Sequence, residues 1–293
     1  MRLSRLLPAA LLAASAPALA QDARPELGAP IDRGINFQEP ATPVAEMLQE
    51  FHNTTVLPII LIIVIFVMVL MLYIMVRFRE SANPVPSKTS HNTLLEVVWT
   101  LVPVLLLLWM VVPSMRLLYF QDRIPESDMT IKAIGDTWAW NYAYPDFEDN
   151  VSEYVSNVLD EDTAEELGVP YLLASDAPLV VPVDTVVRVL VTSNNNMHSF
   201  AMPAFGIKMD AVPGIVNETW FEVRQEGTYY GQCSEICGIK HAYMPIHIEA
   251  VSQEDFAQWV ANGGSFTAPE AVAQATPTTT PTVEASAASG ELN

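Results

Sequence analysis

The chain has 293 residues, 51% of them hydrophobic, and a formal net charge of −20. This length suffices for one sizeable core with additional segments. The charge is concentrated in residues 120–265, where 23 acidic residues stand against six lysines or arginines. Such a surface repels nucleic acid and attracts basic partners. Two cysteines in the whole chain exclude a disulfide framework.

The first twenty residues have the pattern of a secretory signal peptide. Arg2 and Arg5 form a basic start, residues 6–12 are apolar, and Ala18 and Ala20 frame a small-x-small cleavage site. An extra membrane anchor fits less well because the apolar run is too short to span a bilayer. We expect cleavage of residues 1–20 after Ala20, which places the residues that follow outside the cytoplasm.

Two apolar runs predict a transmembrane hairpin over residues 55–116, preceded by a polar N-terminal periplasmic segment over residues 21–54. Residues 56–76 contain no charge and, at about 1.5 Å per residue, are long enough to cross a bilayer as a helix. Residues 97–115 form the second run. The loop between the runs is marked as cytoplasmic by three basic residues, Arg77, Arg79 and Lys88. Both ends of the hairpin therefore lie outside, and prolines within the runs suggest packing against other helices.

Glu96 stands at the cytoplasmic end of the second apolar run. A carboxylate at this depth is costly to bury and is a candidate for a functional role. The alternative is an interfacial glutamate in contact with water or lipid headgroups, and the residues alone favour that alternative.

After residue 129 the pattern changes to short strands rich in β-branched and aromatic residues. Turn residues such as Pro213-Gly214 and Glu226-Gly227 separate several of them. The predicted strands cover residues 129–134, 138–144, 185–193, 218–224, 228–232 and 245–251. They predict an all-β sandwich or barrel over residues 120–262, closed by a short helix over 253–261. Residues 266–293 are rich in Pro, Thr, Ala and Ser and predict a disordered tail.

An acidic stretch interrupts these strands between Asp146 and Asp176. It contains ten acidic residues and no lysine or arginine. Such a run is often only a solvated surface, and it is equally suited to bind a basic protein. The sequence leaves both interpretations open.

Residues 231–245 read GQCSEICGIKHAYMP and hold both cysteines of the chain. Cys233, Cys237, His241 and Met244 offer soft or borderline ligands of the kind that copper prefers, whereas zinc has little use for a methionine. Glycine and proline place the stretch on a loop, and His198, just after a predicted strand, can supply a further imidazole. There are two alternatives, a disulfide and the site of a thiol-based copper chaperone. Both leave the histidine and the methionine of the loop unexplained.

This loop closely resembles the copper-A loop of subunit II of haem–copper cytochrome c oxidases. The resemblance continues in LEVVWTLVP (95–103), WAWNYAY (138–144) and HSFAMPAFGIKMDAVPG (198–214). Quinol-oxidising relatives lack the two cysteines, so the chain is similar to the members that oxidise cytochrome c. The resemblance implies a cupredoxin-like β-sandwich on a two-helix N-terminal transmembrane hairpin, in the bacterial inner membrane with the C-terminal domain in the periplasm.

The resemblance also implies a metal centre of two copper ions. Both thiolates would bridge the two ions, each histidine would bind one ion, and a thioether and a backbone carbonyl would be weak ligands. The ligating residues would be His198, Cys233, Glu235 (through its carbonyl), Cys237, His241 and Met244. The carboxylate of Glu235 would face a magnesium or manganese ion shared with subunit I.

Further roles and partners follow from the same resemblance. Trp138 matches the point at which electrons arrive from cytochrome c, and Glu96 matches the entrance of a proton pathway into subunit I. The chain would pass electrons to haem in subunit I, in a complex that also contains subunit III, where oxygen is reduced to water with proton pumping. A copper-delivery protein, with one labile copper, and a structural subunit with a plain disulfide are the alternatives from other classes.

Two departures from the family pattern concern the docking of cytochrome c. Ala139 stands where relatives carry a tyrosine, and Asn194, Asn195 and Asn196 stand where many carry an acid. The acidic surface that binds cytochrome c can therefore lie on residues 146–176 instead. We predict that oxidation of cytochrome c weakens with rising salt because ions screen that surface.

Overall fold

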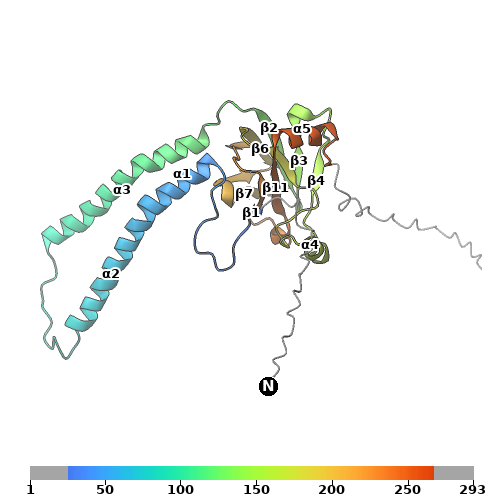
Figure 1. Cartoon of the computed structure of the whole chain (residues 1–293). Helices are drawn as coiled ribbons and strands as arrows, with labels where there is room; N and C mark the ends of the chain where they lie inside the picture. Colours follow the sequence, from blue (N-terminus) through green and yellow to red (C-terminus); the bar gives the residue numbers. More distant parts are fainter. Residues whose placement is uncertain (1–25, 267–293) are drawn as a thin grey trace, which may run out of the picture.

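The computed structural model describes residues 26–266. The signal peptide predicted over residues 1–20 lies outside the described residues, as does the predicted tail after Phe266. Figure 1 shows two parts, a long helical hairpin and a β-domain from which it extends.

The hairpin consists of α2 (Leu57–Arg77) and α3 (Thr93–Asp122). A short helix α1 (Pro43–Phe51) and a π-helical turn η1 (His52–Val56) run directly into α2, which makes one continuous helix of 35 residues. Both helices are long and apolar enough to cross a membrane. Helix α3 extends beyond the predicted apolar run at both ends because Asn92 caps its start and its last turns pack on the β-domain.

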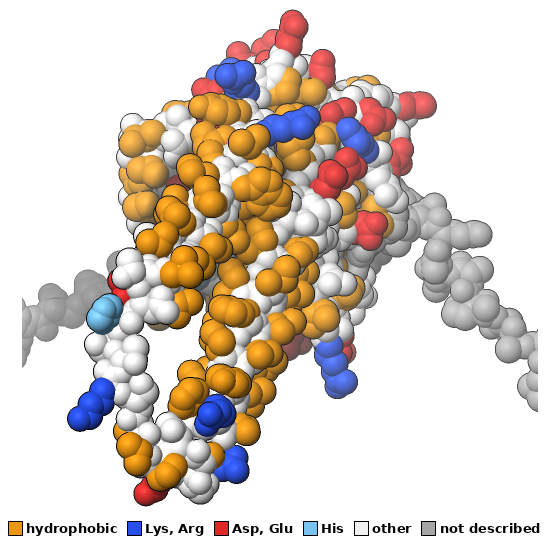
Figure 2. All heavy atoms as spheres, turned by 90° about the vertical axis from the view of Figure 1, so that its left-hand side faces the viewer, with side chains coloured by type: hydrophobic (Ala, Val, Ile, Leu, Met, Phe, Trp, Pro, Cys, Tyr) orange, Lys and Arg blue, Asp and Glu red, His pale blue; other side chains and the backbone are white. Residues whose placement is uncertain are grey.

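The side chains of α2 and α3 are exposed or half exposed along both helices. Figure 2 shows hydrophobic side chains over the whole length of the hairpin, basic side chains at its loop end, and acidic side chains on the β-domain. A helix that is apolar on all sides requires lipid or other helices around it. The hairpin therefore receives its apolar surroundings from outside this chain.

Helix α3 is joined to the β-domain at its end. The rings of Phe120 and Trp220 pack edge to face with centroids 5.6 Å apart. Trp220 Nε1–H donates to the Gln121 carbonyl at 3.1 Å, and Gln121 Nε2–H donates to the Gly206 carbonyl at 3.1 Å. These contacts fix where the domain sits on the hairpin.

Two mixed sheets form the β-domain. One has the order β5-β11-β10-β7-β8, with β1 paired to β10, and the other has the order β4-β3-β2-β6-β9. The strands are β1 (Glu26–Gly28), β2 (Met129–Asp136), β3 (Ala139–Ala143), β4 (Tyr154–Ser156), β5 (Leu179–Pro182), β6 (Val187–Ser193), β7 (His198–Met202), β8 (Ile207–Ala211), β9 (Asn217–Phe221), β10 (Gly227–Cys233) and β11 (Pro245–Val251). Helices α4 (Glu161–Leu167) and α5 (Gln253–Ala261) complete the domain.

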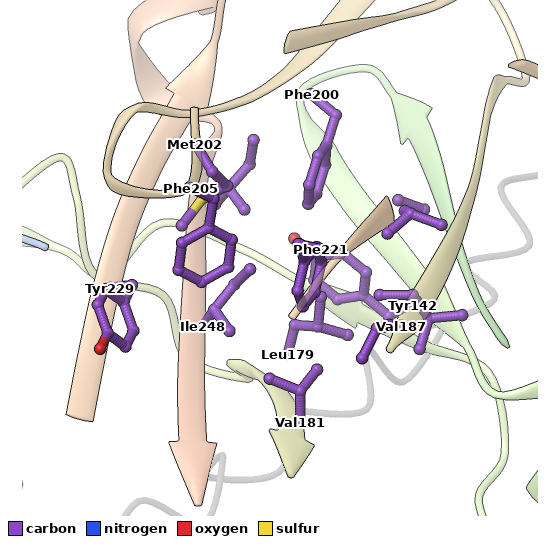
Figure 3. Packing of buried hydrophobic residues seen from close by; sticks show 14 of the residues in the cluster. Tyr142, Leu179, Val181, Val187, Phe200, Met202, Phe205, Phe221, Tyr229 and Ile248 are labelled. Atoms are coloured by element: carbon purple, nitrogen blue, oxygen red, sulfur yellow. The ribbon is translucent and has the colours of Figure 1, made fainter. Parts of the chain in front are cut away.

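The core lies between the two sheets. Strand β6 alternates buried and half-buried residues, as expected for a strand with one face inward. Figure 3 shows side chains of both sheets, among them Tyr142, Leu179 and Ile248, in the shared interior. The rings of Phe205 and Phe221 pack with centroids 4.9 Å apart. This core is the rigid base that holds the loops at the end of the domain.

The all-β interpretation is confirmed, and the six predicted strands coincide with β2, β3, β6, β9, β10 and β11. Five strands were not predicted: β1, β4, β5, β7 and β8. Strands β1 and β4 have only three residues each, and β5 and β7 are buried along their whole length, so their sequences do not alternate. Helix α4 within the acidic stretch was also not predicted. Asp160 caps its first turn and Gly168, with a φ of 68°, ends it.

Candidate metal centre

The predicted copper ligands gather at one end of the β-domain. His198 begins β7 and Cys233 ends β10, and these antiparallel neighbours pair Cys233 with Phe200. The beginning of β7 therefore lies beside the end of β10. Cys237, His241 and Met244 follow on the loop between β10 and β11.

The loop curls back because its backbone is fastened at several points. Ser234 N–H donates to the Ser199 carbonyl at 3.0 Å, and Cys233 N–H donates to the Met244 carbonyl at 3.3 Å. Gly238 adopts a φ of 124°, a conformation that disfavours other residues. A short 3-10 turn, His241–Tyr243, then brings Met244 back over the cysteines.

Five side-chain donor atoms converge at this point. His198 Nδ1 lies 3.2 Å from Met244 Sδ and 3.9 Å from Cys233 Sγ. Cys237 Sγ lies 3.9 Å from Cys233 Sγ and 3.4 Å from Met244 Sδ. His241 Nδ1 lies 3.6 Å from Cys237 Sγ. The sequence prediction thus named side chains that the fold brings into one cluster.

The spacing of the donors fits metal coordination. At metal–ligand distances of about 2.0–2.3 Å, donors around a tetrahedral ion stand roughly 3.3–3.8 Å apart. The observed separations of 3.2–3.9 Å lie around that range. Two thiols, imidazole nitrogens and a thioether are a soft donor set, which favours copper. The residues present therefore fit the metal that the loop sequence predicts.

Burial sets the protonation of these ligands. His198 is fully buried, and burial lowers its pKa, so the ring is neutral and its nitrogen lone pair is available. Burial, together with the neighbouring Cys233, raises the pKa of Cys237 to about 12. In the metal-free protein this thiol keeps its proton, which metal binding must displace.

The alternative of a disulfide is not realised in the described structure. Both cysteines are free, and their sulfur atoms lie 3.9 Å apart, whereas a disulfide bond is about 2.05 Å long. The pair lies under the loop at 5% exposure each. This arrangement favours a ligand role for both thiols.

Glu235 presents its backbone to the cluster. Its carbonyl oxygen lies 3.3 Å from Cys233 Sγ, among the donor atoms. Its side chain is half buried, and its carboxylate makes no hydrogen bond with any residue in the range 26–266. The carbonyl and the carboxylate therefore face different surroundings.

Trp138 lies against the metal loop. Its ring is half buried, and its Nε1–H donates to the Cys237 carbonyl at 3.3 Å. Lys240 Nζ stands 5.9 Å from the ring centroid. A Cβ on Gly238 would come within 3.2 Å of the indole, so glycine is required for this close approach. The indole thus connects solvent directly to the backbone of a predicted ligand.

The three asparagines before His198 have a role that the sequence did not reveal. Asn195 Oδ1 accepts from His198 Nε2 at 3.1 Å, and Asn195 Nδ2–H donates to Asp136 Oδ1 at 2.5 Å. Asn196 Nδ2–H donates to the Cys237 carbonyl at 2.5 Å. This network leaves His198 Nδ1 facing the cluster. The signal was present, since only one residue separates the run from a predicted ligand, but its contacts depend on the loop conformation.

Two further neighbours of His198 were also missed. Trp140 is fully buried, with its ring centroid 6.1 Å from that of His198. Gly135 packs under the imidazole, because a Cβ there would lie 2.7 Å from His198 Cδ2. Only the pairing of β2 with its neighbours reveals either contact.

Glu96 does not belong to this cluster. It lies in the first turn of α3, where the helix dipole favours a carboxylate. Thr100 Oγ1–H donates to the Glu96 carbonyl at 2.8 Å. A shallow hollow of about 310 Å³ along this face is lined by Thr93, Glu96, Val97, Thr100 and Leu101. Glu96 and the predicted copper ligands therefore lie in separate parts of the molecule.

Some carboxylates of the acidic stretch form hydrogen bonds within the fold, and others form none. Asp146 accepts from Thr130 N–H at 2.6 Å, Asp160 caps α4, and Asp176 accepts from Asn157 N–H at 2.7 Å. The other carboxylates make no hydrogen bond within residues 26–266 and point into solvent; they belong to Glu148, Asp149, Glu153, Glu161, Asp162, Glu165 and Glu166. These seven side chains form the available negative surface.

The fold and the cluster define a class. A cupredoxin-like sandwich that carries a buried His/Cys/Cys group in its end loops, joined to two apolar helices, is a membrane-anchored metal-binding protein. A family model described as cytochrome c oxidase subunit II, periplasmic domain, matches residues 129–251, and one described as the transmembrane domain matches residues 30–117. The chain belongs to the cytochrome c oxidase subunit II family.

Two sequence relatives agree with this assignment. A probable cytochrome c oxidase subunit 2 from Rickettsia prowazekii (strain Madrid E) is 47% identical over 232 residues, which cover 79% of this chain and 73% of the relative. Cytochrome c oxidase subunit 2 from Cereibacter sphaeroides is 41% identical over 274 residues, which cover 88% of this chain and 90% of the relative. The solved periplasmic domain of subunit II of cytochrome oxidase of Bradyrhizobium japonicum is 47% identical, covers 48% of this chain and 96% of that structure, and gives a TM-score of 0.44.

Family membership makes the chain a component of cytochrome c oxidase, a haem–copper oxidase. Its apolar helices and its periplasmic-domain match indicate a membrane-anchored protein with an external C-terminal domain. The predicted family, fold class and enzyme class are thereby confirmed.

Proposed function

We propose that the chain accepts electrons from cytochrome c at a dinuclear copper-A centre and passes them to haem in subunit I. There oxygen is reduced to water, coupled to proton pumping. The complex would lie in the bacterial inner membrane with subunits I and III, with the centre on the periplasmic side. The observation that carries this proposal is the convergence of five side-chain donors in a buried cluster at one end of the external domain.

Six residues would hold the copper ions. Cys233 and Cys237 would bridge them, His198 and His241 would bind one each, and Met244 and the Glu235 carbonyl would be weak ligands. When bound, the copper pair supplies one-electron redox chemistry. The chain's own contribution is to exclude water from the cluster and to hold the donors in fixed positions, which limits rearrangement during electron transfer.

Copper content tests the proposal against the two alternatives. We expect two copper ions per chain in the purified, copper-loaded protein, measured by elemental analysis against protein concentration. One labile copper would instead indicate a copper-delivery protein. No copper, with loss of both free thiols, would indicate a structural disulfide.

Trp138 would receive electrons from cytochrome c. The support is its half-exposed ring and its hydrogen bond to the Cys237 carbonyl. Replacing it by phenylalanine removes the N–H donor and should slow oxidation of cytochrome c by about tenfold, equivalent to about 1.4 kcal/mol of activation free energy, with copper content unchanged. Trp259→Phe is the control, because Trp259 packs on Tyr144 and Phe256, away from both the metal loop and the contact with α3.

The acidic side chains of residues 146–176 that form no hydrogen bond would dock a basic cytochrome c. Neutralising Glu148, Asp149 and Asp176 together tests this, but Asp176 also binds Asn157 N–H. A cleaner variant combines Glu148→Gln, Asp149→Asn and Glu165→Gln, which leaves the hydrogen bonds intact. We expect a raised KM and a flatter salt dependence. A steep salt dependence that survives this variant contradicts the docking assignment.

Glu235 and Glu96 would serve subunit I. The Glu235 carboxylate, without a partner in the described chain, would bind a magnesium or manganese ion at that interface. Glu235→Gln should lower the bound manganese of the assembled complex, measured by electron paramagnetic resonance, and leave copper in place.

Glu96 would load a proton pathway into subunit I. Turnover of Glu96→Ala that matches the parent at every pH would contradict this role.

A further inference from the structure

The loop between β1 and α1 exposes large apolar side chains that the metal site does not use. Ile31 is 77% exposed, Ile35 is 97% exposed and Phe37 is 52% exposed. We propose that residues 31–37 rest in the interfacial layer of the outer leaflet and bind phospholipid, so that the β-domain touches the membrane at a point other than its two helices. The inference uses the membrane-anchored arrangement and does not depend on the copper assignment.

The loop is fastened to the helix at the depth where the bilayer begins. Gln49 Nε2–H donates to the Gln38 carbonyl at 2.7 Å, and the rings of Phe37 and His52 pack edge to face with centroids 4.8 Å apart. His52 precedes Leu57, the first residue of the apolar helix, by five residues, which is about 7.5 Å at 1.5 Å per residue.

This height matches the headgroup layer of a bilayer. A hydrocarbon core of about 30 Å within a total thickness of about 40–45 Å leaves roughly 5–7.5 Å of interfacial layer on each side. Figure 1 shows the loop hanging from the β-domain on the side of the helices, in the direction in which α2 leaves the domain. Ile31 and Ile35 are therefore carried toward the lipid and not toward bulk water.

The ends of the loop are fixed to the domain. Gly28 pairs with Tyr229 on β10, Ala41 N–H donates to the Ala204 carbonyl at 2.9 Å, and Thr42 Oγ1–H donates to the Phe205 carbonyl at 2.7 Å. A loop held at both ends transmits its membrane contact to the β-domain. Its attachment would help to set the height and tilt of the domain above the bilayer.

The composition of the loop suits a lipid interface. The turn between Ile31 and Gly34, closed by Gly34 N–H to the Ile31 carbonyl at 3.1 Å, puts isoleucines on both sides of an acid, Asp32, and a cation. That cation, Arg33, forms no ion pair within the described residues and is available to a lipid phosphate. Apolar side chains beside an arginine are typical of segments that lie in the membrane interface.

Photo-crosslinking in the assembled oxidase, in native membranes, tests the proposal. The photoreactive residue p-benzoylphenylalanine replaces Ile35, whose exposed side chain carries no fold contacts. Val155 receives the same replacement as a control, since it is half exposed on β4, at the sheet edge opposite β9 and α3. We expect a mass increase of one phospholipid on the chain from position 35 and none from position 155.

Two results would overturn the proposal. A crosslink from position 35 to another protein subunit would show that a protein, not lipid, covers the loop. Consumption of the photoreactive group without a lipid adduct would show that the loop faces water. The same replacement at Ile31 provides a second reporter, and unchanged recovery of the chain in the assembled oxidase verifies that each variant is folded.

Discussion

The metal end of the β-domain and the helical hairpin differ in how far the chain buries its own side chains. At the metal end, His198, Met244 and the two cysteines are at most 5% exposed, and hydrogen bonds from neighbouring loops fix them. Along the hairpin, apolar side chains remain open, and Leu70, for example, is 43% exposed. One region is completed by its own chain, whereas the other requires lipid and partner helices.

This difference separates two kinds of function. A site that the chain completes by itself can bind its metal without the rest of the complex. A residue that lies on an incomplete surface, such as Glu96 on α3, acquires its surroundings only in the assembled oxidase. Substitutions at the metal end should therefore change metal binding by the chain alone, whereas substitutions on the hairpin should act only in the assembled oxidase.

The largest effect is expected for a cysteine of the cluster. Cys233→Ser removes a donor that lies within 3.9 Å of both His198 Nδ1 and Cys237 Sγ. We expect electron transfer from cytochrome c to fall by more than about 100-fold, beyond the range for loss of a residue that only supports a ligand. Stopped-flow oxidation of cytochrome c measures this. Ser234→Ala, in the same loop and exposed, should leave the rate unchanged.

A smaller effect is expected for the residue that orients His198. Asn195→Ala removes the acceptor at His198 Nε2 and should weaken copper binding about 10–100-fold. Competition with a copper chelator measures the affinity. Asn194→Ala is the matched control, because Asn194 Nδ2–H also donates to Asp136 but Asn194 does not contact His198. Equal losses for both variants would assign the effect to the loop as a whole.

The contrast between core and hairpin can be tested with aliphatic truncations. Ile248→Ala in the fully buried core should cost about 2–5 kcal/mol in the free energy of unfolding. Leu70→Ala on exposed α2 should change it by less than about 0.5 kcal/mol. Chemical denaturation of the detergent-solubilised chain, followed by tryptophan fluorescence, compares them. Similar losses for the two variants would mean that the hairpin has a core of its own.

The smallest expected effects come from removing the hydroxyl groups of two buried tyrosines, one with hydrogen-bond partners and one without. Tyr144 O–H donates to the Val180 carbonyl at 2.9 Å and accepts from Val180 N–H at 3.0 Å, so Tyr144→Phe should cost about 1–3 kcal/mol. The buried Tyr142 hydroxyl has no hydrogen-bond partner among residues 26–266, so Tyr142→Phe should be neutral or stabilising. The reverse order in thermal unfolding would contradict the hydrogen-bond assignments.

The sequence predicted the parts that are local. Cys233, Cys237, His241 and Met244 lie within twelve residues, and their chemistry is rare enough to predict a metal site without a structure. Strand β11 and helix α5 were also predicted at their observed bounds. Local spacing and local periodicity are sufficient for such features.

The remainder depends on contacts between segments distant in the sequence. Asn195 and Gly135 support His198 only because the end of β2 lies beside the end of β6, a register that the sequence does not display. Strand β7 was missed because burial on both faces removes alternation. The structural duties of Asp146 and Asp176 were hidden within an acidic run that looks uniform.

The central claim is that this chain holds a dinuclear centre in which both thiolates are shared by two copper ions. Electron paramagnetic resonance of the copper-loaded full chain, in detergent and without the other subunits, tests it most directly. We predict a hyperfine pattern from one unpaired electron shared equally by two copper nuclei, lost in Cys233→Ser and retained in Ser234→Ala. A pattern from a single copper nucleus in the unmodified chain would contradict the account.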